Sequence, residues 1–114
     1  NRKIPNDQRG GTAKQMLAGA ALYCYGSMLA AALQARDVDF KELHATAELK
    51  MGRSETGKSR VLKMIIRSSV QVNERDEAIF QRVQKMMAQG CLVTGSLHDG
   101  ISMVYELEPI FFSE

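Results

Sequence analysis

The longest uncharged stretch of the sequence, residues 15–35, constrains the fold more than any other feature. Thr12 lies just before it as a candidate helix N-cap, with Gln15 three residues further on, which is the spacing of a capping box. Arg36 follows the stretch, where a cation complements the helix dipole. These signals predict one long helix that ends near residue 35.

A stretch of this length also suits a membrane-spanning helix, which needs about 20 apolar residues. Much of it, however, is Ala and Gly, which add little hydrophobicity, and it contains Ser27, Gln34 and two tyrosines. A helix that is apolar on nearly all sides is typical of the centre of a globular domain, where other elements cover it. We therefore favour a core helix and expect no membrane association.

Three later segments have the alternation of apolar and polar residues that predicts half-buried strands. Residues 43–51 alternate without a break, and in residues 101–108 every second residue from Ile101 to Leu107 is apolar. Residues 61–72 fit either a strand or a helix by spacing. Their β-branched content, together with a hairpin to the preceding strand, favours a strand.

A second helix is predicted between the last two of these strands. Asn73 or Asp76 is its candidate N-cap, and Gly90 lies where a C-cap glycine belongs. The order helix, strand, strand, helix, strand predicts an α+β domain whose mainly antiparallel sheet is wrapped on a hydrophobic helix. A chain of 114 residues forms a single domain, over residues 1–114.

The composition excludes several classes of function. The net charge of +2 comes from 15 basic and 13 acidic residues with no basic run, so we expect no nucleic-acid binding. The polar start of the chain carries no secretory signal. Two cysteines make no disulfide framework, and two reduced thiols suit a cytoplasmic protein.

Residues 52–59 match the phosphate-binding loop pattern G-x-x-x-x-G-K-[ST]. In such a loop Lys58 would reach phosphate oxygens and Ser59 would bind magnesium. That chemistry requires a helix directly after the loop, whereas the sequence predicts a strand there, and the chain is too short for the several βαβ units of a nucleotide-hydrolysing domain. We interpret the motif as a polar hairpin turn.

The histidines give no sign of a metal centre. His44 and His98 lie far apart in the sequence, without a cysteine or carboxylate at metal-ligand spacing. We expect two exposed histidines, no metal and no cofactor.

The two thiols are the candidates for chemistry. Cys24 lies inside the first predicted helix among Ala, Leu and Met, and Cys91 comes directly after the second. Both can be inert core residues, or they can meet if their helices pack side by side. A paired thiolate can attack the O–O bond of a peroxide, become a sulfenic acid and condense with the second thiol to a disulfide. Apolar surroundings would favour an organic hydroperoxide over hydrogen peroxide.

The sequence around both thiols resembles the OsmC/Ohr family, whose members reduce organic hydroperoxides. The resemblance spans about residues 10–108, and its most specific parts are GGT at 10–12, QMLAGAALYC at 15–24 and CLVTGSL at 91–97. It implies an OsmC-like intertwined homodimer, with sheets wrapped around two central helices per subunit and active sites at the subunit interface. It also implies that a small apolar hydroperoxide is the substrate and that a thiol is the reductant.

Three departures from the family pattern concern the activation of Cys24. The family usually has a Glu ten positions before its first cysteine, which holds an activating Arg, and this position is Lys14 here. We expect the N-terminal strands that carry this Arg to be short or missing, with Arg2 and Arg9 as the basic residues in their place. Leu92 follows the second cysteine where the family usually has Pro.

These inferences give two hypotheses. The first is a thiol-dependent peroxidase of the OsmC type, with Cys24 as the peroxidatic nucleophile and Cys91 as the resolving thiol. The alternative is an OsmC-like module that has lost catalysis and serves in binding or structure, for example by holding a small apolar ligand at the dimer interface.

Overall fold

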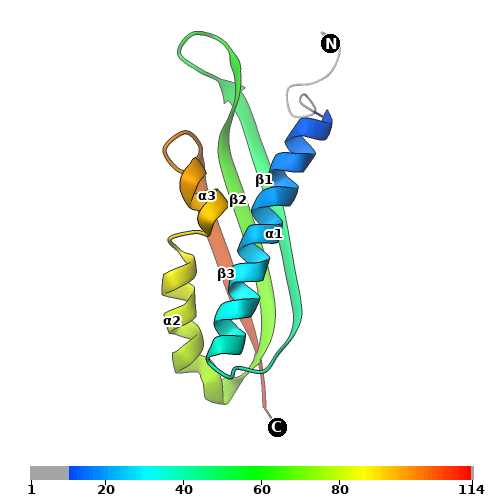
Figure 1. Cartoon of the computed structure of the whole chain (residues 1–114), viewed down its shortest axis with the longest axis vertical. Coiled ribbons are helices and arrows are strands. Elements are labelled where there is room, and N and C mark those ends of the chain that lie inside the picture. The colour runs from blue at the N-terminus through cyan, green and yellow to red at the C-terminus, as the bar shows by residue number, and fades with distance from the viewer. Residues whose placement is uncertain (1–10, 114) are drawn as a thin grey trace.

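The computed structural model describes residues 11–113 as one sheet with helices packed along it (Figure 1). In chain order the elements are α1 (Gly11–Ala35), β1 (Phe40–Arg53), β2 (Ser59–Asn73), the 3₁₀ helix η2 (Glu74–Asp76), α2 (Glu77–Met87), α3 (Leu92–Leu97) and β3 (Ser102–Phe112). The predicted α+β class and the predicted order of the main elements are confirmed.

Helix α1 is the long helix that the uncharged stretch predicts, and it ends at Ala35 as expected. It begins at Gly11, so Thr12 lies in its first turn and not at the predicted N-cap position. Its buried residues recur three or four positions apart and form one stripe: Ala21, Tyr25, Leu29, Ala32 and Leu33. This stripe is the side by which α1 packs on β1, α2 and α3.

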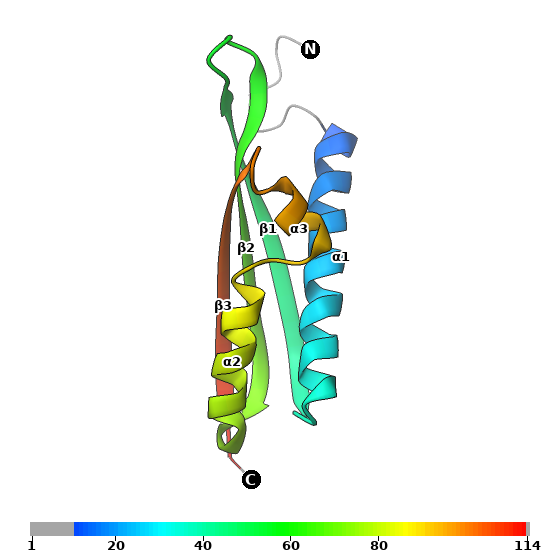
Figure 2. The same cartoon turned by 60° about the vertical axis from the view of Figure 1, so that its left-hand side comes forward.

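Among the described residues, α1 is also the one helix that is long and apolar enough to cross a membrane. The core helix of a soluble protein meets the same criterion of length and composition. In this fold, α1 is packed lengthwise against the sheet (Figure 2).

The three strands contain the segments predicted from alternation, except for Ile101, which precedes β3. Strands β1 and β2 form the expected antiparallel hairpin, with Ala47 opposite Ile66. Strand β3 lies on the other side of β2 and runs parallel to it, with Tyr105 opposite Ile66. The sheet is therefore mixed and not mainly antiparallel as predicted, because the crossover through α2 and α3 returns the chain to the end of the sheet where it can run parallel to β2.

The core lies between the helices and one face of the sheet, since α1, α2 and α3 all lie on that side (Figure 2). Alternate residues of β2 point into it, and α2 contributes a stripe of three; these residues are Met64, Ile66, Val70, Val72, Phe80, Val83 and Met87. No element of residues 11–113 covers the opposite face, which we call the open face.

The motif at residues 52–59 forms the tip of the β1–β2 hairpin. The Ser54 N–H donates to the Lys58 carbonyl at 2.9 Å, and the Gly57 N–H donates to the Ser54 carbonyl at 2.9 Å. Gly57 has a φ of +79°, which suits a tight turn. A strand follows the motif where a phosphate-binding loop requires a helix, so the interpretation as a polar turn is confirmed.

The connection from β2 to β3 contains one expected helix and one unexpected helix. Asn73 caps η2, accepting from the Arg75 N–H at 3.0 Å, and Asp76 occupies the N-cap position of α2 without a side-chain cap bond. Gly90 has a φ of +81°, but α2 ends at Met87 and its C-cap is Ala88, so the predicted C-cap at Gly90 is wrong by two positions. The sequence did not predict α3, because six residues are too few to display a helical period.

Candidate active site

Cys24 lies in the middle of α1, directly before Tyr25 of the buried stripe. Its side chain is half-buried and packs against the edge of the core. Because the helix turns by about 100° per residue, Cys24 is set to one side of the stripe, where α1 faces the neighbouring helices. The thiol therefore belongs to the core and retains some access to solvent.

Cys91 is the N-cap residue of α3 and is almost fully buried, with 5% of its surface exposed. The Cys91 N–H donates to Thr94 Oγ1 at 2.9 Å, and the Thr94 N–H donates to Cys91 Sγ at 3.5 Å. The sulfur and the Thr94 hydroxyl are a further 3.3 Å pair. This reciprocal arrangement is a capping box in which a thiol takes the place of the usual Ser or Thr hydroxyl.

The surroundings of Cys91 change its acidity. Burial raises the pKa of the Cys91 thiol, but hydrogen bonds from the Thr94 hydroxyl and N–H, from the Cys24 thiol and from the Val93 N–H outweigh burial. The net result is a pKa below the ordinary value. Since the Cys24 thiol is one of these hydrogen-bonding groups, the fold brings together two cysteines that lie far apart in the sequence.

The turn before Cys91 requires a glycine, Gly90. Besides its positive φ, Gly90 lies so close to the Tyr105 and Thr94 hydroxyls that a Cβ atom there would collide with both. The tight turn before Cys91 thus depends on Gly90, which also allows Tyr105 of β3 to approach Thr94.

Tyr25, the residue after Cys24 on α1, packs against the sheet. Its ring stacks on Tyr105, with centroids 5.6 Å apart and planes 7° from parallel. Its fully buried hydroxyl makes no hydrogen bond of ordinary geometry with the described residues, and the nearby Ser68 hydroxyl donates instead to the Glu106 carbonyl at 3.3 Å. Burial raises the pKa of Tyr25, against an opposing effect of Ser68 and with smaller contributions from Tyr105 and Cys91.

Sequence reasoning singled out both thiols and missed the hydroxyls around them. Thr94, Tyr25 and Tyr105 were assigned only to elements or to the family pattern. One signal was present for Thr94: it follows Cys91 by three residues, which is the spacing of a capping box.

Of the basic residues named in connection with the activation of Cys24, the structure describes Lys14 alone. Lys14 lies ten residues before Cys24 on the continuous helix α1, a distance of roughly 15 Å along the axis. Arg2 and Arg9 lie outside the described residues 11–113. Within that range, the groups that act on the Cys91 pKa include no charged side chain.

Both histidines are exposed and pair with neighbouring carboxylates. His44 Nε2 lies 3.2 Å from Glu42 Oε2, and His98 Nδ1 lies 3.1 Å from Asp99 Oδ1. No group of three His, Cys, Asp or Glu side chains within residues 11–113 could hold a metal ion.

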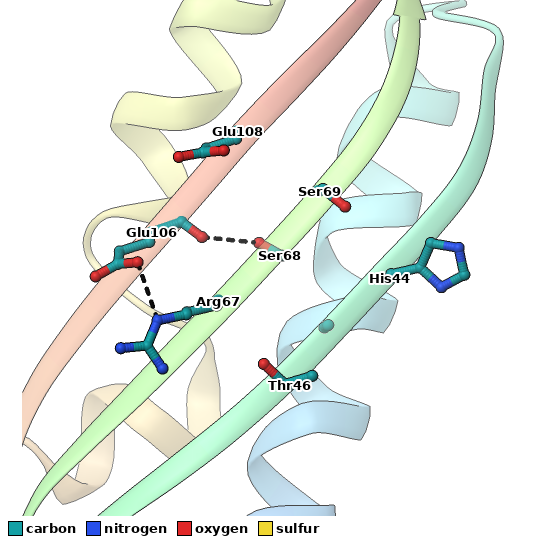
Figure 3. A pocket seen from close by; sticks show the side chains of 8 residues that line it. His44, Thr46, Arg67, Ser68, Ser69, Glu106 and Glu108 are labelled. Carbon is teal, nitrogen blue, oxygen red and sulfur yellow. Dashed lines mark hydrogen bonds and ion pairs between the residues drawn. The ribbon is translucent and has the colours of Figure 1, made fainter.

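A shallow hollow of about 280 Å³ lies on the open face, away from both thiols (Figure 3). Arg67 forms part of its lining and bridges Glu106 at 3.2 Å and Glu48 at 2.8 Å, while Lys50 pairs with Glu48 at 2.6 Å. The Lys50 and Arg67 hydrogen bonds lower the pKa of Glu48 to about 2. These ion pairs are exposed to solvent, and the Arg67–Glu106 pair in the lining already satisfies its own charges.

The fold and the site together define an α+β protein in which a thiol on a long core helix meets a thiol that caps a short helix. The chain belongs to the OsmC-like protein family, which it matches over residues 6–106. This confirms the resemblance drawn from the sequence, and the family includes organic hydroperoxide resistance proteins.

Solved structures agree on the fold. A hypothetical protein from Aquifex aeolicus is 17% identical with a TM-score of 0.69, over 91% of this chain and 77% of that one. The organic hydroperoxide resistance protein OhrB of Bacillus subtilis is 15% identical with a TM-score of 0.59, over 91% and 78%. The organic hydroperoxide resistance protein OsmC of Legionella pneumophila is 13% identical with a TM-score of 0.56, over 93% and 77%. No curated protein sequence matches the chain.

Proposed function

We propose that this protein is a thiol-dependent peroxidase that reduces organic hydroperoxides through a cycle of two cysteines. The observation that carries the proposal is the pairing of Cys24 and Cys91, two free thiols from separate helices that meet at the edge of the core. Membership of a family that includes organic hydroperoxide resistance proteins supports the same chemistry.

In the proposed cycle, the Cys24 sulfur attacks the outer oxygen of R–O–O–H as a thiolate. The O–O bond breaks, the alkoxide takes up a proton and leaves as an alcohol, and Cys24 becomes a sulfenic acid. The Cys91 sulfur then attacks the Cys24 sulfur, the hydroxyl group leaves as water, and a disulfide forms. An external thiol supplies the two electrons that restore both thiols by exchange.

The surroundings of the pair support an organic substrate. Exposed apolar side chains directly adjoin both thiols in the chain: Tyr23, with 80% of its surface exposed, precedes Cys24, and Leu92, with 82% exposed, follows Cys91. Such side chains can bind the carbon chain of a hydroperoxide, whereas hydrogen peroxide would gain nothing from them.

A homodimer would explain why the outer side of α1 lacks charged residues. That side is uncharged and exposed, with Met16 and Tyr23 as its largest residues. A second copy could cover this surface and place each thiol pair near the subunit interface, as the family resemblance implies. We also assign the protein to the cytoplasm, where free thiols persist.

The departure at Lys14 favours a second candidate, an OsmC-like binding or structural module without catalysis. Lys14 stands where the family usually has the Glu that holds the activating Arg, and no charged side chain of residues 11–113 acts on the Cys91 pKa. In that case the thiols and their apolar neighbours would hold a small apolar ligand without reacting.

The two candidates separate in one experiment. Reduced protein is mixed with cumene hydroperoxide, the remaining free thiols are counted over time, and the mass of the assembly is measured by light scattering. The peroxidase is expected to lose both thiols within seconds to minutes and to form an intramolecular disulfide, and Cys24→Ser should abolish this reaction. Thiols that remain unreactive for hours would contradict the peroxidase and favour the non-catalytic module.

A further inference from the structure

Thr94 places two hydrogen-bond donors, its hydroxyl and its N–H, next to the Cys91 sulfur. An ionised sulfur can only accept, and in that state the Thr94 hydroxyl, 3.3 Å away, and the Thr94 N–H, 3.5 Å away, both donate to it. Thr94 is fully buried, and its oxygen already accepts from the Cys91 N–H at 2.9 Å, so its side chain is fixed beside the sulfur. The site is therefore built to receive negative charge at Cys91.

The titratable groups that face Cys91 come from two elements. Helix α1 contributes Cys24 and Tyr25, and β3 contributes Tyr105, whose hydroxyl lies beside Gly90 and Thr94. None of these groups carries positive charge at neutral pH. A thiolate at this position relies on hydrogen bonds from neutral donors, of which the Cys24 thiol is one.

The sulfur that has the hydrogen-bond donors is not the sulfur that is more exposed to solvent. Cys91, which has the donors, is almost fully buried, whereas Cys24 is only partly buried and adjoins the exposed Tyr23. A hydroperoxide can therefore reach Cys24 first. Its thiol must lose a proton to react, and the Cys91 sulfur, to which that thiol donates a hydrogen bond, can take this proton.

We propose that the Cys91 sulfur is the base that deprotonates Cys24, and that Thr94 is the positioning residue that keeps Cys91 ionised. This inference rests on the proposed peroxidase function and gives a way to activate Cys24 that needs no charged side chain of residues 11–113. In a hydrogen-bonded thiol pair the first ionisation belongs to both sulfurs, so a single proton is shared between them.

The step balances without any further reactant. The shared proton moves from Cys24 to Cys91 as the Cys24 sulfur forms its bond to the outer peroxide oxygen and the O–O bond breaks. The alkoxide then takes that proton from Cys91 and leaves as an alcohol, which leaves Cys24 as a sulfenic acid and Cys91 again as a thiolate. Cys91 can now attack the Cys24 sulfur, and the hydroxyl group leaves as hydroxide, which an acid of the surrounding buffer protonates to water.

A substitution at Cys91 distinguishes a role of this residue as the base from a role as resolving thiol alone. In Cys91→Ser, Ser keeps a good N-cap for α3, so the fold should persist, and this is checked by thermal melting. The sulfenic acid at Cys24 is trapped with dimedone and quantified by mass spectrometry during reaction with cumene hydroperoxide. If Cys91 is the base, formation of the sulfenic acid slows on the order of 100-fold relative to the thiol loss of the wild type. An unchanged rate would reduce Cys91 to a resolving thiol and overturn the inference.

Substitutions at Thr94 test the positioning role. Thr94→Val removes the hydroxyl with little change of shape, and Thr94→Ser keeps it as a matched control. The rate of thiol loss is measured from pH 5 to pH 9. Because Thr94→Val removes a donor to the ionised sulfur, the rise of the rate with pH should move upward by roughly one pH unit, while Thr94→Ser should follow the wild type.

The outcomes also separate this inference from the proposed function. Peroxide reduction with a pH profile that Thr94→Val does not move would retain the peroxidase and overturn the role of Thr94. Absence of sulfenic acid in the wild type at every pH would overturn the peroxidase itself and, with it, the need for a base.

Discussion

The two faces of the sheet differ in how they perturb side-chain acidity. On the open face, Glu48 pairs with Lys50 and Arg67, and these charges hold its pKa at about 2. On the helix-covered face, burial and neutral donors change the acidity of Tyr25 and Cys91. Water screens the exposed charges, whereas the buried hydrogen bonds act in a medium of low dielectric constant. The more highly charged face is therefore not the one where we expect chemistry.

The largest difference between the faces should appear when the same residue type is truncated on each. Ile66 is fully buried on the covered face, and the strand alternation places Ile110, with 51% of its surface exposed, on the open face. Ile66→Ala should lower the free energy of unfolding by about 2–5 kcal/mol because it leaves a cavity in the core. Ile110→Ala should change it by about 0.5 kcal/mol or less. Urea denaturation measures both, and equal losses would contradict a one-sided core.

Two glycines with nearly the same backbone conformation sharpen the comparison. Gly90, near the thiols, has a φ of +81°, and Gly57, in the hairpin turn, has a φ of +79°. An added Cβ meets nothing within 4 Å at Gly57, whereas at Gly90 it collides with the Tyr105 and Thr94 hydroxyls.

Gly57→Ala should therefore cost only the backbone strain, about 1 kcal/mol. Gly90→Ala should cost about 2–3 kcal/mol more, and it should also displace Thr94 from Cys91. Thermal denaturation gives the stabilities, and the rate of thiol loss with cumene hydroperoxide reports the displacement. Similar stability losses for the two variants would show that the corner at Gly90 is loosely packed.

The smallest effect is expected for the ion pairs of the open face. The lowered pKa of Glu48 means that its carboxylate stabilises the folded state above its ordinary pKa of 4.5, and that this contribution is lost as the pH falls toward about 2. Glu48→Gln should thus have a slightly lower urea midpoint than the wild type at pH 7, and the difference should vanish between pH 4.5 and pH 2.

Salt provides the control for this prediction. The pair is exposed, so 1 M NaCl should remove most of the difference already at pH 7. A difference that survives both acid and salt would mean that Glu48 contributes through packing and not through charge.

Local patterns predicted those parts of the fold that local interactions determine. The uncharged stretch marked α1 to its last residue, alternation identified β1 and β3, and β-branched content decided for a strand at β2. The polar residues and glycines at 52–59 also marked the hairpin turn, whereas Gly90 placed the end of α2 two residues beyond its C-cap, Ala88. Each of these signals lies within a few residues of the structure that it predicts.

The parts that were missed depend on contacts between distant segments. The direction of β3 is set by a crossover whose second helix is too short to show a period. The two thiols could be named from the sequence, but Thr94 gains its significance only because α3 presents it to the Cys91 sulfur beside α1. Tyr25 was only one of the two tyrosines in the first helix, and nothing in the sequence places its ring on Tyr105.

The parallel pairing of β3 with β2 has a consequence for the order of folding. The β1–β2 hairpin joins neighbouring segments and can form within microseconds, whereas β3 can pair only after the chain has closed a long loop through α2 and α3. Cys24 and Cys91 are likewise distant in the sequence, and their thiols meet only when α3 packs on α1. A nascent or partly folded chain would keep them apart, and premature disulfide formation within the chain would be suppressed by topology.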